Sequence, residues 1–339
     1  MDLNQQYYKR VLGAIGCAML IFEALFQIFG VLLGVIAAVL DLTLTSTVAY
    51  NVVFQILYAA GYMTVFMLPV VFLRMILRKR GCPIQPMSLS PRFSPMLPLM
   101  IFAGVTVCFS MAQINSSILD LFGYSDVVGD MTVEQMRGME PYEIVLNFIV
   151  ISIVPGFCEE FLFRGAILSN CRPFGRANAI LISSVLFALM HQNAAQILYT
   201  FAAGVVLGLV YEYTGSIWNC TLLHMLNNFI SLAQEVILDK LGANDYGIAV
   251  LYLVETLIYL GGIVSIGVLV YRYFSQKDRL SDGAFGKVIP PHDAYAQYPV
   301  EGRVAAKLFF RPSMIVFVVL VAAQIGMTIL LFSFIGVLT

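Results

Sequence analysis

Residues 143–168 read EIVLNFIVISIVPGFCEEFLFRGAIL, an apolar run that contains two adjacent glutamates, Glu159 and Glu160. A helix that crosses a membrane needs about 20 mostly apolar residues, because each residue adds 1.5 Å and the hydrocarbon core is about 30 Å thick. The run is long enough for one crossing. A charged carboxylate near the centre of such a helix costs roughly 2.5–3.5 kcal/mol on insertion scales. The stretch therefore predicts a membrane helix that keeps two carboxylates for a functional reason.

The apolar composition of this run extends over the whole chain of 339 residues. Hydrophobic residues make up 60% of it and charged residues 12%, whereas soluble domains have about 25% charged residues. This excludes an ordinary soluble enzyme, a disordered tail protein and a nucleic-acid binder. The six cysteines show no CxxC spacing, so neither a disulfide framework nor a zinc knuckle is expected. We expect an integral, all-α, multi-pass membrane protein.

Nine apolar stretches are candidates for membrane helices, although the first is too long for one straight crossing and the fifth is short. With nine crossings, all but two of the 19 lysines and arginines fall on one side of the membrane. Basic residues accumulate in cytoplasmic loops, so we expect a cytoplasmic N-terminus and an external C-terminus. The nine stretches are residues 11–40, 48–73, 96–118, 143–168, 177–193, 196–213, 217–237, 248–271 and 314–338.

These spans suggest three parts of the chain. Residues 1–141 hold the first three spans and an acidic loop that we expect outside. Residues 142–237 hold spans four to seven, the expected catalytic core. Residues 238–339 hold the last two spans and a long loop, 272–313, which we expect in the cytoplasm. No convincing internal repeat is present, which weighs against the common transporter designs.

The polar residues of the fourth span suggest two roles, an ion pair and a general base. Glu160 and Arg164 are four residues apart, so they share one helix face and can form an ion pair. Glu159 points about 100° away from Glu160 and lacks that partner, so it is a candidate general base. Alternatively, Glu160 and Arg164 form a structural ion pair near a helix end while Glu159 lies in water.

Two histidines follow this pair in the apolar region. His191 lies four residues after Phe187, and His224 shares a helix face with Asn228. A lone membrane histidine is more often a hydrogen-bond partner between helices, but two of them beside a glutamate pair favour a functional site. His191 lies about 21 Å from the cytoplasmic start of its span, nearer the far side of the membrane, whereas Glu159 and His224 fall in the cytoplasmic half of their spans. The three meet only if the fifth helix starts deep, tilts or ends in a re-entrant turn.

Three motifs, in order and on separate predicted spans, resemble those of the CPBP family. This family comprises the type II CAAX prenyl endopeptidases and the bacteriocin-processing or immunity proteins, also called Abi. The similarity covers roughly residues 142–233. The motifs are Glu159-Glu160-x-x-x-Arg164, Phe187-x-x-x-His191 and His224-x-x-x-Asn228.

The resemblance implies hydrolysis of a peptide bond within the membrane. It implies that Glu159 is the base that activates water and that His191 orients or polarises this water. It also implies that His224 and Asn228 stabilise the tetrahedral oxyanion, a role that suits preorganised donors in a dry site. No GxSxG motif is present, which disfavours a serine mechanism.

The resemblance further implies that Glu160 and Arg164 hold the base in place, and it leaves the metal question open. We favour a site without a metal or other cofactor. Zinc is the alternative, with Glu159, His191 and His224 as ligands and a water in the fourth position. No HExxH helix is present, so such ligands would come from three different helices.

The expected partners are the lipid bilayer and a membrane-associated peptide or protein substrate. Another membrane protein is an additional candidate partner. Nucleic acid is not expected.

Two other functions stay open beside the endopeptidase. One is a non-catalytic membrane regulator or immunity protein of the CPBP family, and the other is an ion-coupled transporter that uses carboxylates at the membrane midplane.

Overall fold

The stretch with the two glutamates forms one continuous helical path from Pro141 to Phe174 in the computed structural model. The structure describes residues 2–89, 91, 93–121, 139–241, 245–275 and 297–338. Two π-helical turns flank the glutamates, and such turns are often found at functional sites. The segments of this path are α5 (Pro141–Asn147), η2 (Phe148–Ile153), α6 (Val154–Glu160), η3 (Phe161–Leu168), α7 (Ser169–Cys171) and η4 (Arg172–Phe174).

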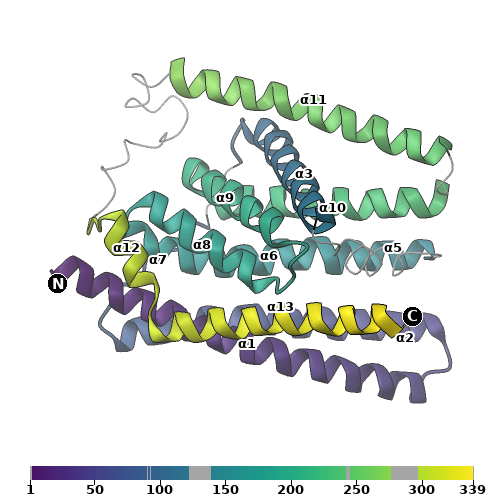
Figure 1. The fold of residues 1–339 in the computed structure, drawn as a ribbon, viewed down its shortest axis with the longest axis horizontal. Helices are drawn as coiled ribbons and strands as arrows, with labels where there is room; N and C mark the ends of the chain where they lie inside the picture. Colours follow the sequence, from purple (N-terminus) through teal and green to yellow (C-terminus); the bar gives the residue numbers. More distant parts are fainter. Residues whose placement is uncertain are drawn as a thin grey trace.

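Long helices pack around this path, and no strand occurs among the described residues (Figure 1). The two chain ends lie at opposite ends of the bundle (Figure 1). These helices are α1 (Leu3–Thr43), α2 (Thr47–Lys79), α3 (Leu97–Leu121), α8 (Arg176–Met190), α9 (Ile197–Thr214), α10 (Ile217–Leu241), α11 (Asp245–Ser275), α12 (Gly302–Phe309) and α13 (Pro312–Leu338).

The prediction of an all-α multi-pass membrane protein is confirmed. Seven helical segments of the described residues are long and apolar enough to cross a membrane. Each of the nine predicted stretches lies on a helix, but α8 and α10 are not among these seven. The count of nine and the orientation therefore stay predictions. Two predicted loops lie partly outside the described residues. The gaps are residues 122–138, which hold most of the predicted acidic loop and its Arg137, and residues 276–296 of the loop 272–313.

Two glycines let consecutive helices turn back on one another, one before α8 and one before α10. Gly175, between η4 and α8, has φ 125°, and Gly215, between α9 and α10, has φ 61°. Residues with a side chain rarely adopt these positive φ values. The two turns allow α8 and α10 to run back along the helices that precede them.

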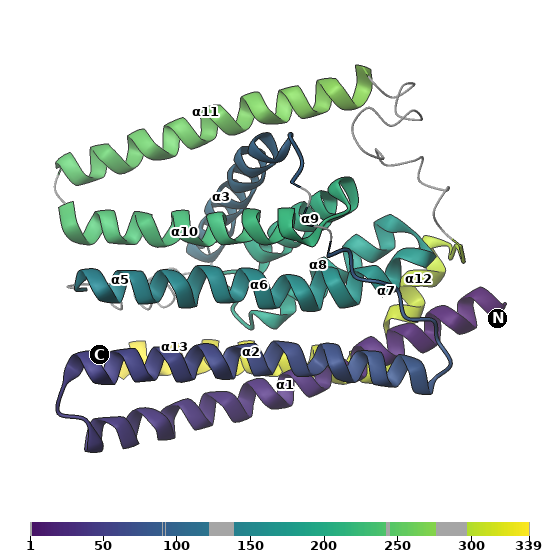
Figure 2. The ribbon, with the colours of Figure 1, turned by 180° about the vertical axis from the view of Figure 1, so that it is seen from behind.

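The α8–α9 turn explains how His191 reaches the other site residues. α8 has 15 residues, about 22 Å of helix, so it is shorter than the hydrocarbon core. Its turn into α9 lies near the middle of the bundle's length (Figures 1 and 2). The buried Asn115 of α3 fixes this turn, because its Nδ2 donates to the Ala195 carbonyl at 2.6 Å and its Oδ1 accepts from Leu198 N at 3.3 Å. The short α8 and the fixed turn after it thus let His191 line the same pocket as Glu159 and His224.

Glycines, which have no side chain, let the helices around the site approach one another closely. A Cβ atom at Gly156 of α6 would lie 2.6 Å from Met225 Cγ of α10, one residue beyond His224. A Cβ atom at Gly204 of α9 would lie 2.8 Å from Ser184 Cα of α8. Small residues at such contacts let membrane helices approach closely. The site therefore depends on backbone-to-backbone packing of α6, α8, α9 and α10.

Gly204→Ala is expected to destabilise the protein by about 1–3 kcal/mol, the usual cost of overpacking a tight contact. The matched control is Gly267→Ala on α11, where an added Cβ atom meets nothing within 4 Å. The measurement is the free energy of unfolding in detergent micelles. Equal stability of the two variants would show that the α8–α9 contact is looser than described.

Candidate active site

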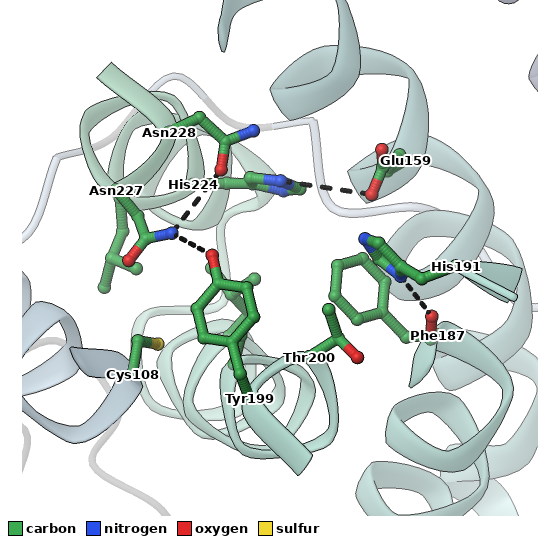
Figure 3. A pocket seen from close by; sticks show the side chains of 12 residues that line it. Cys108, Glu159, Phe187, His191, Tyr199, Thr200, His224, Asn227 and Asn228 are labelled. Atoms are coloured by element: carbon green, nitrogen blue, oxygen red, sulfur yellow. Dashed lines mark hydrogen bonds and ion pairs between the residues drawn. The ribbon is translucent and has the colours of Figure 1, made fainter. Parts of the chain in front are cut away.

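A small pocket brings together residues of α3, α6, α8, α9 and α10 (Figure 3). Glu159 of α6, His191 at the end of α8, and His224 and Asn228 of α10 all line it. Its volume is about 50 Å³, which is enough for a few water molecules. The six predicted site residues therefore fall into two groups, four on the pocket and two behind it.

The two residues behind the pocket are Glu160 and Arg164. Both are fully buried, and Arg164 Nη1 lies 2.9 Å from Glu160 Oε1, so the pairing predicted from their spacing is confirmed. His224 Nδ1 donates to the same oxygen at 2.9 Å. Arg164 Nη2 donates to the Gly204 carbonyl at 3.0 Å, and the guanidinium lies 4.6 Å from the centre of the Phe187 ring. One carboxylate oxygen thus fixes an arginine and a pocket histidine.

Glu159 has one anchored and one available oxygen. It is 3% exposed. Its Oε1 accepts a short hydrogen bond from the Tyr62 hydroxyl of α2. Its Oε2 has no hydrogen-bond partner among the described residues and lies 3.9 Å from His224 Nε2. Tyr62 therefore fixes the carboxylate while the second oxygen is left to bind a water molecule.

The two histidines present their Nε2 atoms to the pocket. His191 Nδ1 donates to the Phe187 carbonyl at 2.8 Å, and His224 Nδ1 donates to Glu160. With Nδ1 engaged in both rings, the neutral tautomer has Nε2 as an acceptor. The Phe187 ring packs between them, with centroids 4.9 Å from His191 and 5.8 Å from His224. Phe187 therefore orients both rings.

The two asparagines form hydrogen bonds to neighbouring groups, and the oxyanion role that the resemblance implies for Asn228 stays a prediction. Asn228 Nδ2 donates to the Ile151 carbonyl at 3.1 Å, and its Oδ1 accepts from Asn227 Nδ2 at 3.4 Å. Asn227 Nδ2 also donates to the Tyr199 hydroxyl oxygen at 2.7 Å. That bond leaves the Tyr199 hydroxyl proton to donate elsewhere, and Tyr199 lines the pocket (Figure 3). Tyr199 is thus a donor that the sequence analysis missed.

Tyr62 was also missed, and no sequence signal could have found it. It is one of 17 tyrosines and lies on an apolar helix about 100 residues before Glu159. For Tyr199, the sequence offered only an indirect indication of a role in the site, namely its position eight residues after His191. Only Asn227, adjacent to Asn228, was visible as a polar neighbour in the sequence.

A second polar cluster holds the loop that follows His191. Gln192 has φ 52°, a positive value that is uncommon for a residue with a side chain. Its Nε2 donates to Glu23 Oε2 of α1 at 2.7 Å. Glu23 Oε1 accepts from Gln27 at 3.0 Å and from Gln324 of α13 at 2.6 Å. Helices far apart in the sequence therefore fix the end of α8.

The zinc alternative is not decided by the geometry of this site. In the part of the chain that the structure describes, no group of three His, Cys, Asp or Glu side chains is arranged to hold a metal ion. The proposed ligands Glu159, His191 and His224 line the same pocket, and the hydrogen bonds at Nδ1 of both histidines leave their Nε2 atoms available. Zinc therefore stays an alternative, and no chemical step below uses a metal.

Fold and site together define a multi-pass membrane protein with a buried acid–histidine pocket. Residues 141–230 match the family described as Type II CAAX prenyl endopeptidase Rce1-like. The match covers about a quarter of the chain and falls almost entirely within the predicted core of residues 142–237. No curated protein and no solved structure matches the chain.

Glu160→Gln is expected to destabilise the protein by about 3–5 kcal/mol, because it leaves the Arg164 charge buried without its partner. The matched control is Glu255→Gln on α11, whose Oε1 only accepts from Gln234 at 3.0 Å. A glutamine accepts that bond equally well, so this control is expected to lose less than about 1 kcal/mol. Unfolding in detergent, followed by circular dichroism, checks both. Equal losses would mean that the buried ion pair does not stabilise the fold.

Proposed function

We propose that this protein is an intramembrane endopeptidase that hydrolyses a peptide bond of a membrane-associated peptide or protein. The observation that carries the proposal is the hydrogen bonding of the two carboxylate oxygens of Glu159. This buried carboxylate has one oxygen held by Tyr62 and one unbonded oxygen beside His224 in a pocket of water size. The family match over residues 141–230 supports the same activity.

The reaction begins with a water molecule between Glu159 and His191. Glu159 Oε2 takes a proton from this water as its oxygen attacks the carbonyl carbon of the scissile bond. The hydrogen bond from Tyr62 keeps the carboxylate oriented during the transfer. His191 Nε2 accepts the second water proton in a hydrogen bond, because its Nδ1 is engaged by the Phe187 carbonyl. General-base catalysis of this kind contributes typically 10²–10⁴-fold.

The tetrahedral oxyanion then needs donors. His224 lines the pocket with its Nδ1 held by Glu160, and the resemblance gives this residue the role of one oxyanion donor. The Tyr199 hydroxyl is a second donor, oriented by Asn227. The intermediate collapses as the C–N bond breaks and the proton on Glu159 passes to the leaving amine. The products are a new amine and a new carboxylic acid, which releases the second water proton to become a carboxylate.

The size of the pocket limits what enters it. Sites that enclose a whole ligand have volumes of about 300–1,000 Å³, whereas this one has about 50 Å³. It accommodates the attacking water and the reacting carbonyl, not a peptide. The rest of the substrate therefore lies along the helices around the pocket, and its entry requires side-chain or helix movement.

Glu159→Gln is expected to lower peptide hydrolysis at least about 100-fold, because the amide cannot accept a proton from water. The assay compares wild type and variant, purified in detergent, against a quenched membrane-peptide library. Glu255→Gln, the same chemical change on α11, is the control with activity retained.

Two outcomes of this assay would change the proposal. Full retention of a cellular phenotype by Glu159→Gln would favour a non-catalytic regulator over an enzyme. Loss of wild-type cleavage on chelation, restored by zinc, would replace the metal-free mechanism with a metal-dependent one.

Tyr199→Phe is expected to lower kcat by about 10²–10³-fold with little change in KM, because it removes one donor to the oxyanion. Tyr213→Phe on the same helix, away from the pocket, is the matched control. Steady-state kinetics on a cleaved peptide gives both constants. A change in KM alone would assign Tyr199 to substrate binding instead.

A further inference from the structure

A second, larger cavity lies at the end of the bundle where α1 begins, α2 ends and α13 begins. Its volume is about 840 Å³. It shares no lining residue with the pocket around Glu159. Any ligand bound here would therefore be separate from the peptide substrate, and the inference below does not rest on the proposed activity.

Four cationic side chains line this cavity: Lys9 and Arg10 of α1, Arg80 directly after α2, and Arg311 directly before α13. No carboxylate is among the lining residues. Within the described part of the chain, none of the four forms an ion pair with an acidic side chain. Four like charges around one space repel each other unless an anion joins them.

The position of Arg80 depends on the surface of α1. Its Nη1 donates to the Arg10 carbonyl at 2.9 Å. A Cβ atom at Gly13 would lie 2.7 Å from this same Nη1. The missing side chain at Gly13 thus makes room for the guanidinium against α1. Arg80 is therefore held at the cavity wall and does not extend freely into solvent.

The start of α13 is held against α1 in a similar way. A Cβ atom at Gly16 would collide with Ser313, and Ser313 Oγ donates to the Gly13 carbonyl at 3.4 Å. This contact brings Arg311 to the cavity, although it is about 300 residues from Lys9 in the sequence. The cations are thus gathered by specific packing of three helices.

We propose that this cavity binds the phosphate group of an anionic ligand. Arginine pairs with phosphate through two parallel hydrogen bonds, and three arginines from different parts of the chain line the same space. Its volume lies in the range of sites for organic ligands. Basic pockets between membrane helices near the bilayer surface bind lipid headgroups. Both a phospholipid headgroup and a soluble phosphate ester supply this chemistry, and the membrane location favours the lipid.

The test uses the full chain in zwitterionic detergent and follows thermal unfolding during titration with three probes. The probes are phosphatidylglycerol, phosphatidylcholine and soluble glycerol phosphate. Wild type is compared with Arg80→Gln/Arg311→Gln and with Arg78→Gln/Lys79→Gln. The second double variant removes the same charge from the exposed end of α2, outside the cavity.

Phosphatidylglycerol is expected to raise the Tm of wild type and of Arg78→Gln/Lys79→Gln. Its apparent affinity is expected to fall at least tenfold in Arg80→Gln/Arg311→Gln, and phosphatidylcholine is expected to have no such effect. A shift with glycerol phosphate as large as with the lipid assigns the site to a soluble ester.

Equal phosphatidylglycerol binding by both double variants, or equal binding of the two lipids by wild type, would overturn the proposal. Arg311→Gln alone serves if the double variant does not fold. The Arg311 side chain makes no hydrogen bond or ion pair within the described residues. Its replacement should therefore affect ligand binding and leave the unliganded Tm unchanged.

Discussion

The site depends on one carboxylate oxygen, Glu160 Oε1, which lies 2.9 Å from both Arg164 Nη1 and His224 Nδ1. Buried charges are tolerated only when partners compensate for their lost hydration. Here the compensation joins the helical path of α6 and η3 to α10, and through the bond from Arg164 to the Gly204 carbonyl it also joins α9. The same bonds orient His224 toward the pocket. The residues that stabilise the bundle therefore also arrange the candidate chemistry.

Helices outside the family match complete this arrangement. Tyr62 of α2 holds Glu159, Asn115 of α3 holds the α8–α9 turn, and Glu23 of α1 holds Gln192 beside His191. Residues 141–230 supply the acid–histidine set, while the first three helices fix its geometry. A fragment limited to the matched residues would lose these hydrogen bonds.

Local spacing made part of this site predictable from the sequence. The Glu160–Arg164 pair follows from a separation of four residues, and the membrane helices follow from apolar length. The orientation of Asn228 toward Ile151 and the role of Tyr62 did not follow, and a turn after the fifth span was only one of three options, because each depends on contacts between distant helices. A tyrosine in an apolar helix has no pattern that distinguishes a functional hydroxyl from packing. The count of nine spans and the cytoplasmic N-terminus stay predictions, because they concern a membrane and not contacts within the chain.

The central claim is that Glu159 activates water instead of attacking the substrate itself. A single turnover in H₂¹⁸O, with protein in excess over a cleaved peptide, tests this claim by mass spectrometry of both the peptide product and the Glu159 segment. Activated water predicts one ¹⁸O atom in the new carboxylate of the product and none in Glu159. Label in the Glu159 side chain with an unlabelled product would show covalent attack by the carboxylate and would contradict the account.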